Sequence, residues 1–298
     1  MNLRALMYFE ELARSNSMRE VAEKFGVAPT AVTRQIENLE EHFGVQLLER
    51  SARGVTLTPA GEILAGQAGK TVREMNHIQQ LMDDLDGLKA GRICIYANGA
   101  AVTHILAPVL ARFSVAHPNL RFEVHITSAV EAMEALRLAK ADIAISLFAP
   151  RLPDYKVRSR ISVAYDVVMR ADHPLALKSH VTFEDLTGLP LALPDEKFAA
   201  RVAIDEMAAR AGLELDPVFV TGSMEMLKEL VLGNAALTLL PKVAVLRELE
   251  EERMICVPFQ KDQQVRTEIV LCVSPDRPLT AAASTFVSFV EQFMAEGR

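Results

Sequence analysis

The sequence predicts an α/β protein with a helical N-terminal head, one long connecting helix and a two-lobed α/β domain. Three patterns predict this fold class. Two short helices separated by a glycine occupy residues 17–43, an apolar repeat of about 3.5 residues covers residues 64–88, and strand-like and helix-like segments alternate from residue 93 onward. A chain of 298 residues is long enough for two or three domains. We expect the head at 1–58, the linker helix with a hinge at 59–90 and the α/β domain at 91–298.

The head is predicted to begin with a helix that is capped by Asn2. Ser17 and Glu20 have the spacing of a capping box, which starts a second helix, and Gly26 can end that helix with a positive φ. Pro29 suits the first position of a third helix, which is predicted over residues 29–43. The apolar residues of this third helix recur on one face and are expected to be buried: Val32, Ile36, Leu39 and Phe43.

A short helix, a glycine turn and a second helix form a helix-turn-helix. In this motif the N-terminal residues of the second helix meet base edges in the major groove of DNA. Arg34 can bond guanine O6 and N7 as a fork. Thr30 and Thr33 can bond a base or a phosphate, and Pro29 can contact a thymine methyl group. The pattern therefore predicts double-stranded DNA as a partner.

Two short strands, expected at residues 47–50 and 55–57, add a wing to this motif. The turn between them is expected at residues 51–54. Arg50 and Arg53 lie at the wing, where they can hold phosphates or enter the minor groove. The head is thus predicted to be a winged helix-turn-helix.

Charge limits how such a head could bind DNA. The whole chain carries a formal net charge of −7, which argues against non-specific coating of nucleic acid. A nucleic-acid binder concentrates its basic residues on one face, and Arg34, Arg50 and Arg53 fall at the expected contact points. Binding must then rely on local placement and on avidity between subunits. The alternative is a compact three-helix piece without a role in DNA binding.

An ordered set of motifs runs through the first 61 residues. It comprises Ser17, Ala22, the run at 31–36, Leu39-Glu40, and the runs at 47–50 and 57–61. With these motifs the chain resembles the LysR-type transcriptional regulators. It departs from their pattern at three positions. The family usually has Ser at the positions of Ala28 and Thr33, and it often has Gln at the position of Pro29. We therefore expect this chain to have a base preference of its own. The resemblance adds Gln35 to the residues expected at the DNA.

The long helix is predicted to begin at Thr58 and Pro59 and to reach residue 88. Its apolar residues are spaced like a coiled-coil seam, so it is expected to pair with the same helix of a second subunit: Leu64, Ala68, Val72, Met75, Ile78, Met82, Leu85 and Leu88. The alternative is packing against its own α/β domain. Paired heads would demand a near-palindromic operator with half-sites one helical turn apart. The resemblance also implies this homodimer, often a homotetramer, and RNA polymerase as a further candidate partner.

The α/β domain is expected to follow a hinge between Gly87 and Gly91. A βαβαβ order at 93–147, with helices over 103–116 and 128–139, predicts a parallel sheet with helices on its faces. The second of these helices opens with the capping box Ser128–Glu131. The resemblance implies a two-lobed form like that of periplasmic binding proteins, with lobes at 91–161 plus 267–298 and at 162–266. Further strands and helices are predicted in order at 190–193, 198–211, 218–220, 223–232, 236–240, 265–273 and 280–295.

Ligands of such sheets bind beyond the carboxyl ends of strands, near helix N-termini. Free N–H groups there favour a carboxylate or another small anion, so the cleft between the lobes is expected to take a small anionic effector. The alternative is that Ser128 and Ser223 act only as helix caps. The candidate effector-binding residues are Asn98, Gly99, Ala100, Ala101, Thr127, Ser128, Pro194 and Thr221.

Several other functions are not supported by the sequence. The seven histidines form no metal-binding spacing, and no P-loop or G-x-S-x-G motif is present, so we expect neither an enzyme nor a metal or cofactor. No signal segment or membrane span is predicted, which makes the cytoplasm the expected location. The alternative to a DNA-binding regulator is a cytoplasmic small-molecule-binding protein whose N-terminal helices serve oligomerisation only.

The three cysteines lie in apolar, strand-like runs. Cys94, Cys256 and Cys272 are therefore expected to be small buried hydrophobic residues. A redox role is the alternative, although no neighbouring cluster of basic residues would lower a thiol pKa.

Overall fold

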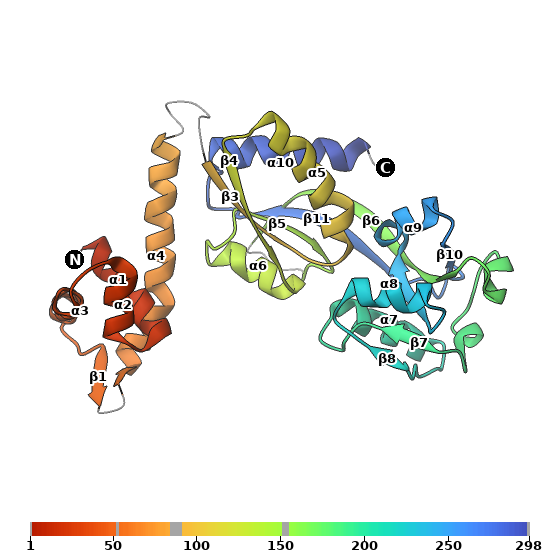
Figure 1. Ribbon diagram of the computed structural model, residues 1–298, viewed down its shortest axis with the longest axis horizontal. Coiled ribbons are helices and arrows are strands. Elements are labelled where there is room, and N and C mark those ends of the chain that lie inside the picture. The colour runs from red at the N-terminus through yellow and green to blue at the C-terminus, as the bar shows by residue number, and fades with distance from the viewer. Residues whose placement is uncertain (1, 52–53, 84–90, 151–154, 297–298) are drawn as a thin grey trace. The chain divides into compact units, whose positions relative to one another are not determined.

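The computed structural model describes residues 2–51, 54–83, 91–150 and 155–296 (Figure 1). The chain forms two compact units, one of residues 1–87 with 138–140 and one of residues 88–137 with 141–298. The domain boundaries predicted after residues 58 and 90 stay predictions, and the predicted hinge lies outside the described residues. Within the described ranges, no helix combines the length and the apolar character that crossing a membrane requires.

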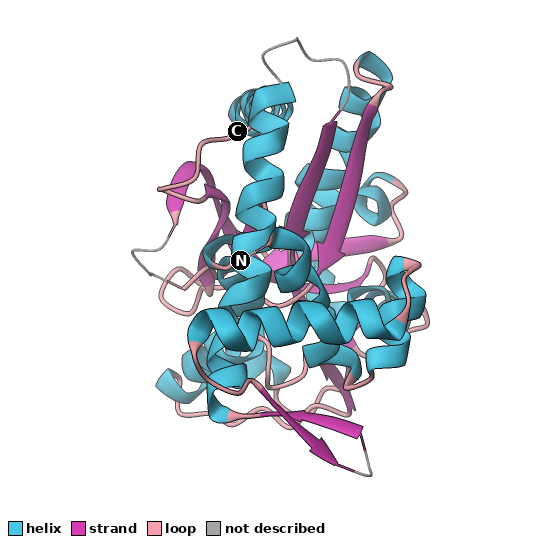
Figure 2. Ribbon diagram, turned by 90° about the vertical axis from the view of Figure 1, so that its left-hand side faces the viewer, coloured by secondary structure: helices cyan, strands magenta, loops and turns pink. Residues whose placement is uncertain are grey.

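The first unit is a winged helix-turn-helix followed by a long helix, as predicted. Its wing strands pair antiparallel, with Leu48 opposite Leu57 and Ser51 opposite Gly54, and project as a hairpin (Figure 2). The predicted four-residue turn is therefore too long, because only residues 52–53, which lie outside the described residues, separate the strands. The elements are α1 (Leu3–Ser15), α2 (Met18–Phe25), α3 (Pro29–Phe43), β1 (Leu48–Ser51), β2 (Gly54–Leu57) and α4 (Pro59–Asp83).

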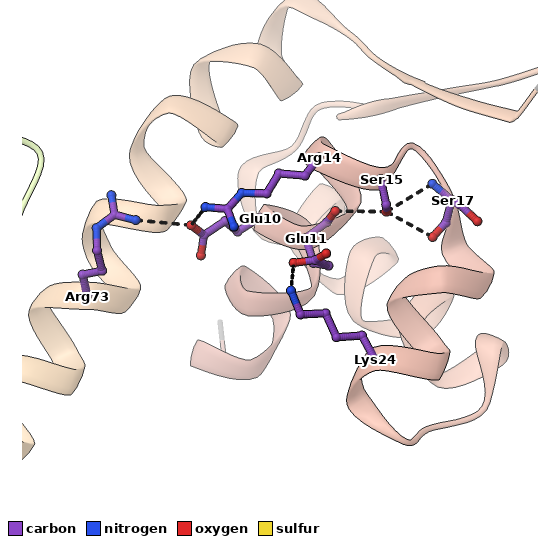
Figure 3. Close-up of polar contacts among 7 residues, drawn as sticks. All are labelled: Glu10, Glu11, Arg14, Ser15, Ser17, Lys24 and Arg73. Atoms are coloured by element: carbon purple, nitrogen blue, oxygen red, sulfur yellow. Dashed lines mark hydrogen bonds and ion pairs between the residues drawn. The ribbon is translucent and has the colours of Figure 1, made fainter. Parts of the chain in front are cut away.

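The predicted caps define the helices of the head. The Asn2 side chain accepts a hydrogen bond from the N–H of Arg4, and Gly26 ends α2 with φ 63°. Only half of the first capping box forms. The Ser17 hydroxyl accepts from the N–H of Glu20 at 3.3 Å, but the N–H of Ser17 donates to Ser15 Oγ at 3.4 Å (Figure 3).

The core of the head confirms most of the predicted apolar face of α3. Val32, Ile36 and Leu39 are fully buried against α1 residues that include Phe9. Phe43 is the exception, with 45% of its surface exposed. It lies in the last turn of α3, where it lines an apolar groove instead of entering the core.

Polar contacts join α3 to the wing and cap the start of α4. Glu40 Oε1 accepts hydrogen bonds from the N–H groups of Leu47 and Leu48, at 2.8 and 3.2 Å. Thr58 Oγ1 accepts from the N–H of Gly61 at 3.0 Å and so caps α4. A Cβ atom on Gly61 would lie 2.1 Å from the Leu47 carbonyl oxygen. The helix can approach the wing this closely only because residue 61 is glycine.

We predict that Gly61→Ala destabilises the head by about 1–3 kcal/mol, because backbone atoms must move to admit the methyl group. Gly66 of the same helix is a matched control, since nothing lies within 4 Å of its virtual Cβ. Gly66→Ala should stabilise the helix by about 0.5–1 kcal/mol. Hydrogen exchange of head amides in the full-length protein measures both effects. Equal exchange rates in the two variants would contradict the close-contact explanation.

The second unit is a two-lobed α/β domain built on one mixed sheet. In the described residues its strands follow the order β4-β3-β5-β11-β6-β9-β7-β8, and β10 pairs with β6. The strands are β3 (Gly91–Ala97), β4 (Leu120–Ile126), β5 (Ile143–Leu147), β6 (Lys156–Arg170), β7 (Leu191–Leu193), β8 (Phe219–Val220), β9 (Leu237–Pro241), β10 (Met254–Pro258) and β11 (Arg266–Val273).

The two lobes share the long strand β6. Its first half pairs with β11, and its second half pairs with β9 and β10. The parallel pairs expected in the first lobe, β3 with β4 and with β5, are confirmed. The sequence did not predict β6 or β10. Because β6 and β11 run antiparallel to their neighbours, the sheet is mixed instead of purely parallel.

Helices cover the sheet in both lobes. In the first lobe α5 and α10 lie on one face and α6 on the other (Figure 1). The predicted helix at 103–116 begins one residue earlier, as a π-helix, before it continues as α5. The predicted end of α6 at residue 139 is two residues late. The helices are η2 (Val102–Leu106), α5 (Ala107–Ala116), α6 (Ala129–Arg137), η3 (Pro174–Leu177), η4 (Glu184–Leu186), α7 (Ala199–Arg210), α8 (Met224–Leu232), η5 (Lys242–Ala244), α9 (Leu246–Glu250) and α10 (Ala281–Glu296).

Candidate DNA interface and effector cleft

The first turns of α3 present their polar side chains at the surface of the head. Pro29, Thr30 and Arg34 are exposed, and Thr33 and Gln35 are half-buried. The Thr33 hydroxyl donates a hydrogen bond to the Pro29 carbonyl at 3.2 Å, which leaves its oxygen able to accept another. The structure therefore brings together the five α3 residues that the sequence placed at the DNA.

Most of the other basic side chains on the helices of the head are neutralised by glutamates. Arg14 contacts Glu10 at 3.1 Å, and Arg73 of α4 contacts the same carboxylate at 3.3 Å (Figure 3). Lys24 pairs with Glu11 in the same view. These ion pairs connect α1 to α2 and α4, so these basic side chains stabilise the packing of the head.

Arg34 differs from these residues. Within the described part of the chain it forms no ion pair and no side-chain hydrogen bond. All donors of its guanidinium group are free to meet an external acceptor, and a planar fork of this kind matches the O6 and N7 atoms of guanine. The side chains of Arg50 and Arg53, predicted at the wing, lie outside the described residues.

In the α/β domain, the segment after β3 was predicted to meet the effector. Asn98 Oδ1 accepts from the N–H of Leu147 at 2.7 Å, and its Nδ2 donates to the Leu147 carbonyl at 3.2 Å. This amide thus joins the ends of β3 and β5. Ala100 and Ala101 are buried, and Gly99 adopts φ 53°. The Asn98 amide is bonded to Leu147, and the side chains of Ala100 and Ala101 are buried. A ligand at this segment would therefore meet backbone N–H groups instead of side chains.

The segment after β4 contains a complete capping box. The Ser128 hydroxyl accepts from the N–H of Glu131 at 3.2 Å, and Glu131 Oε2 accepts from the N–H of Ser128 at 3.2 Å. The hydroxyls of Thr127 and Ser128 donate to the same carboxylate oxygen. These bonds, above all that from Thr127, hold the pKa of Glu131 below its usual value. The N-terminus of α6 therefore already holds an anion supplied by the chain.

In the second lobe, the two predicted residues also have internal partners. Pro194 is buried, and its carbonyl accepts from Arg201 Nη1 at 3.2 Å. Thr221 Oγ1 accepts from the N–H of Ser223 at 3.2 Å, and the Ser223 hydroxyl accepts from the N–H of Met226 and so caps α8. The capping role weighed for Ser128 and Ser223 is thus confirmed for both, and an effector role of the predicted residues stays a prediction.

A cavity of about 1050 Å³ opens beside the strands that join the lobes. Arg160 and Glu268 face each other across β6 and β11 at 3.4 Å, and Phe148 is held with φ 53°, an unusual conformation for a bulky residue. None of the predicted effector residues lines this cavity. Its lining comes from both lobes: Phe148, Ala149, Tyr155, Val157, Arg160, Ser162, Ala199, Arg266, Thr267, Glu268 and Val270.

Two family models together match nearly the whole chain. Residues 3–62 match the bacterial regulatory helix-turn-helix protein, lysR family, and residues 86–295 match the LysR substrate binding domain. The chain belongs to the LysR family of transcriptional regulators. It is a DNA-binding transcriptional regulator with an effector-binding domain, and family membership shows that it is not an enzyme.

Curated relatives match this chain over almost its full length. A hydrogen peroxide-inducible genes activator from Pectobacterium carotovorum is 26% identical over 99% of this chain and 97% of its own length. The transcriptional regulator IlvY of Escherichia coli is 27% identical over 93% of this chain and 94% of its own length.

Solved structures share the fold. A full-length OxyR variant from Pseudomonas aeruginosa superposes with a TM-score of 0.70 at 21% identity, covering 97% of this chain and 94% of that one. The regulator CbnR superposes with a TM-score of 0.68 at 19% identity, covering 98% and 99%. CbnR has also been solved in complex with its target DNA.

The cysteines of this LysR-family chain only partly match the prediction of burial. Cys272 is buried, whereas Cys94 and Cys256 are half-buried. Burial raises the pKa of Cys94 to about 11 and those of Cys256 and Cys272 to about 12. Because the thiolate is the reactive form, these thiols are poor nucleophiles at neutral pH. This weakens the alternative of a redox role.

Proposed function

We propose that this regulator binds a near-palindromic operator as a homo-oligomer and that a small effector in the cleft of its α/β domain controls the binding. The observation that carries the proposal is the exposed Arg34 guanidinium, which has no internal partner among the described residues and stands at the N-terminal end of α3. Thr30 and Pro29 flank it on the same surface. The first turns of α3 would enter the major groove, with Arg34 on a guanine.

Pairing of two subunits through α4 is supported by the apolar surface of that helix. Ala68 and Val72 of the predicted seam are buried in the head. Met75, Ile78 and Met82 continue the seam and are 47%, 42% and 58% exposed. A second copy of α4 would cover them, as in a coiled coil.

The head offers a continuous apolar surface next to this seam. A groove of about 460 Å³ runs between the end of α3 and the start of α4, and Phe43, Val45 and Ile63 at its rim are exposed. We infer that the partner subunit also covers this groove. Further exposed apolar residues on β4 and β8, which are the outer strands of the sheet, support a second contact and hence a homotetramer: Val124, Ile126 and Val220.

Selection from a random DNA duplex library tests the proposal. The full-length protein should enrich a near-palindromic sequence with two half-sites about one helical turn apart. Absence of any enriched sequence, with small-molecule binding retained, would favour the second candidate, a small-molecule-binding protein whose head serves oligomerisation only. We expect the regulator to act in the cytoplasm and to contact RNA polymerase at its promoters.

We infer that the effector is a small anion and that it binds away from the N-terminus of α6. The Glu131 carboxylate occupies the α6 site and would repel a second anion. Helices also begin after Gly99 and after Ser223, and the cavity described above is lined by Arg266 and by Arg160, which pairs with Glu268. These groups favour an effector carboxylate there. In the proposed mechanism, the effector binds the two relative positions of the lobes with different affinity, which changes how the heads sit on DNA.

We predict that Glu131→Gln raises the affinity of the protein for small carboxylates. Glutamine keeps an acceptor for the N–H of Ser128 but removes the charge, so a carboxylate can also approach the N-terminus of α6. Two charges about 4 Å apart in water interact by about 1 kcal/mol, so the expected gain is at most about fivefold in affinity. Calorimetry with benzoate and succinate as probes measures the change. Glu134→Gln, on the same helix but outside the cap, is the control for net charge. A fall in affinity for Glu131→Gln would show that Glu131 contributes to binding.

A further inference from the structure

A thiol, a carboxylate and an imidazole meet on one face of the first lobe. Cys94 comes from β3, and Glu123 and His125 come from β4. Each residue offers one ligand atom, and these three atoms lie within 4.8 Å of one another. All three side chains are half-buried, so solvent and solutes can reach them. The family assignment and the proposed function leave this cluster unexplained.

The register of two parallel strands creates the cluster. Cys94 pairs with Glu123, and Tyr96 pairs with His125, so all four side chains point to the same face of the sheet. His125 Nε2 lies 3.0 Å from Glu123 Oε1, and the Tyr96 ring packs on the imidazole with a centroid separation of 4.6 Å. Such packing restricts the orientation of a ligating ring. No spacing in the sequence shows the cluster, because separate strands supply its members.

The charges around the cluster suit a divalent cation. At neutral pH Glu123 pairs with Arg92, whose side chain is 61% exposed and can turn away into solvent. A metal ion could then replace Arg92 as the counter-ion of Glu123. A thiolate, a carboxylate and a neutral imidazole together carry two negative charges, which match one divalent cation.

We propose that Cys94, Glu123 and His125 bind a divalent transition-metal ion, with zinc as the best fit. Sulfur, nitrogen and carboxylate oxygen are the three ligand types that zinc takes in proteins, and water would complete a tetrahedral site. Calcium and magnesium prefer all-oxygen sites and are disfavoured by the thiol. The ligand atoms lie farther apart than they would around a bound ion, so small side-chain rotations must bring them together.

Binding would displace the thiol proton. A cysteine thiol ordinarily carries its proton at pH 7. The bound thiol loses its proton to the solvent as the metal–sulfur bond forms, without any change in oxidation state. One proton should therefore be released for each ion bound. The bound ion would fasten the outer strand β4 to β3.

The test uses full-length protein stripped with a chelator and then titrated with Zn²⁺ or with Co²⁺ as a spectroscopic probe. We expect one ion per chain, release of about one proton per ion at pH 7, and a near-ultraviolet thiolate-to-cobalt absorption band. Cys94→Ser should abolish the band, and His125→Gln should weaken Zn²⁺ binding by at least about tenfold. Cys256→Ala, which alters another half-buried thiol, should retain both properties.

Absence of the band in the wild-type protein, or its persistence in Cys94→Ser, would overturn the proposal. Circular dichroism of each variant shows whether the domain is folded. If Cys94→Ser unfolds, His125→Gln decides the matter, because its half-exposed ring can be replaced with little change in packing. Unchanged Zn²⁺ affinity in a folded His125→Gln variant would likewise exclude the site.

Discussion

Substitution of both Ile78 and Met82 by aspartate is expected to separate the paired subunits and to weaken operator binding by about 10²–10⁴-fold. Both side chains belong to the exposed part of the α4 seam. Facing carboxylates would meet across a coiled-coil interface, where apolar contacts are required. Each head would then bind its half-site alone and lose the avidity of a bivalent complex, which is typically worth such a factor.

Sedimentation velocity measures the subunit separation, and titration of a two-half-site duplex measures the affinity. A matched control is the double variant Asn76→Asp and Gln80→Asp, which adds the same charge with the same spacing at positions that lie off the seam. The control should stay dimeric and keep its affinity. If the Ile78 and Met82 variant also stays dimeric, the subunits do not pair through α4.

Arg34→Ala is expected to lower operator affinity by about 1–3 kcal/mol, or about five- to 150-fold, and to relax the preference for one base pair in each half-site. Arg34 has no internal partner among the described residues, so its removal should leave the fold of the head unchanged. Arg14→Ala is the matched control, because the Glu10 carboxylate already neutralises that arginine. Gel-shift titrations with the selected duplex and its single-base variants measure both effects.

An Arg34→Ala variant that binds with unchanged affinity and unchanged base preference would remove this residue from base recognition. A uniform loss of affinity on all duplexes would instead indicate a phosphate contact, which a reduced salt dependence of the binding constant would support.

Local sequence rules predicted the parts of this fold whose structure is fixed by near neighbours. Pro29 and Gly26 mark helix ends because of their own backbone preferences. Ser128 and Glu131 satisfy each other within one turn of helix. Such features need no knowledge of the rest of the chain, so the sequence shows them directly.

Features that depend on distant partners could not be predicted in this way. The first half of β6 alternates exposed and half-buried residues and follows the turn residues Pro150, Pro153 and Asp154, so the sequence indicates a strand here but not its length. It becomes a strand of 15 residues because β11, β9 and β10 pair along it. Asn98 had a suitable position for a ligand, but its amide bonds Leu147 from a strand distant in the sequence. The metal-binding cluster on β3 and β4 depends on strand register in the same way.

The central claim is that paired heads read base edges through Arg34, and a double-mutant cycle on DNA tests it most directly. In each half-site of the selected duplex, the guanine assigned to Arg34 is replaced by 7-deazaguanine, which lacks the N7 acceptor. We predict that this replacement weakens binding of the wild-type protein, and that it has almost no further effect on Arg34→Ala. Equal losses for the two proteins would show that Arg34 does not contact that base and would contradict the claim.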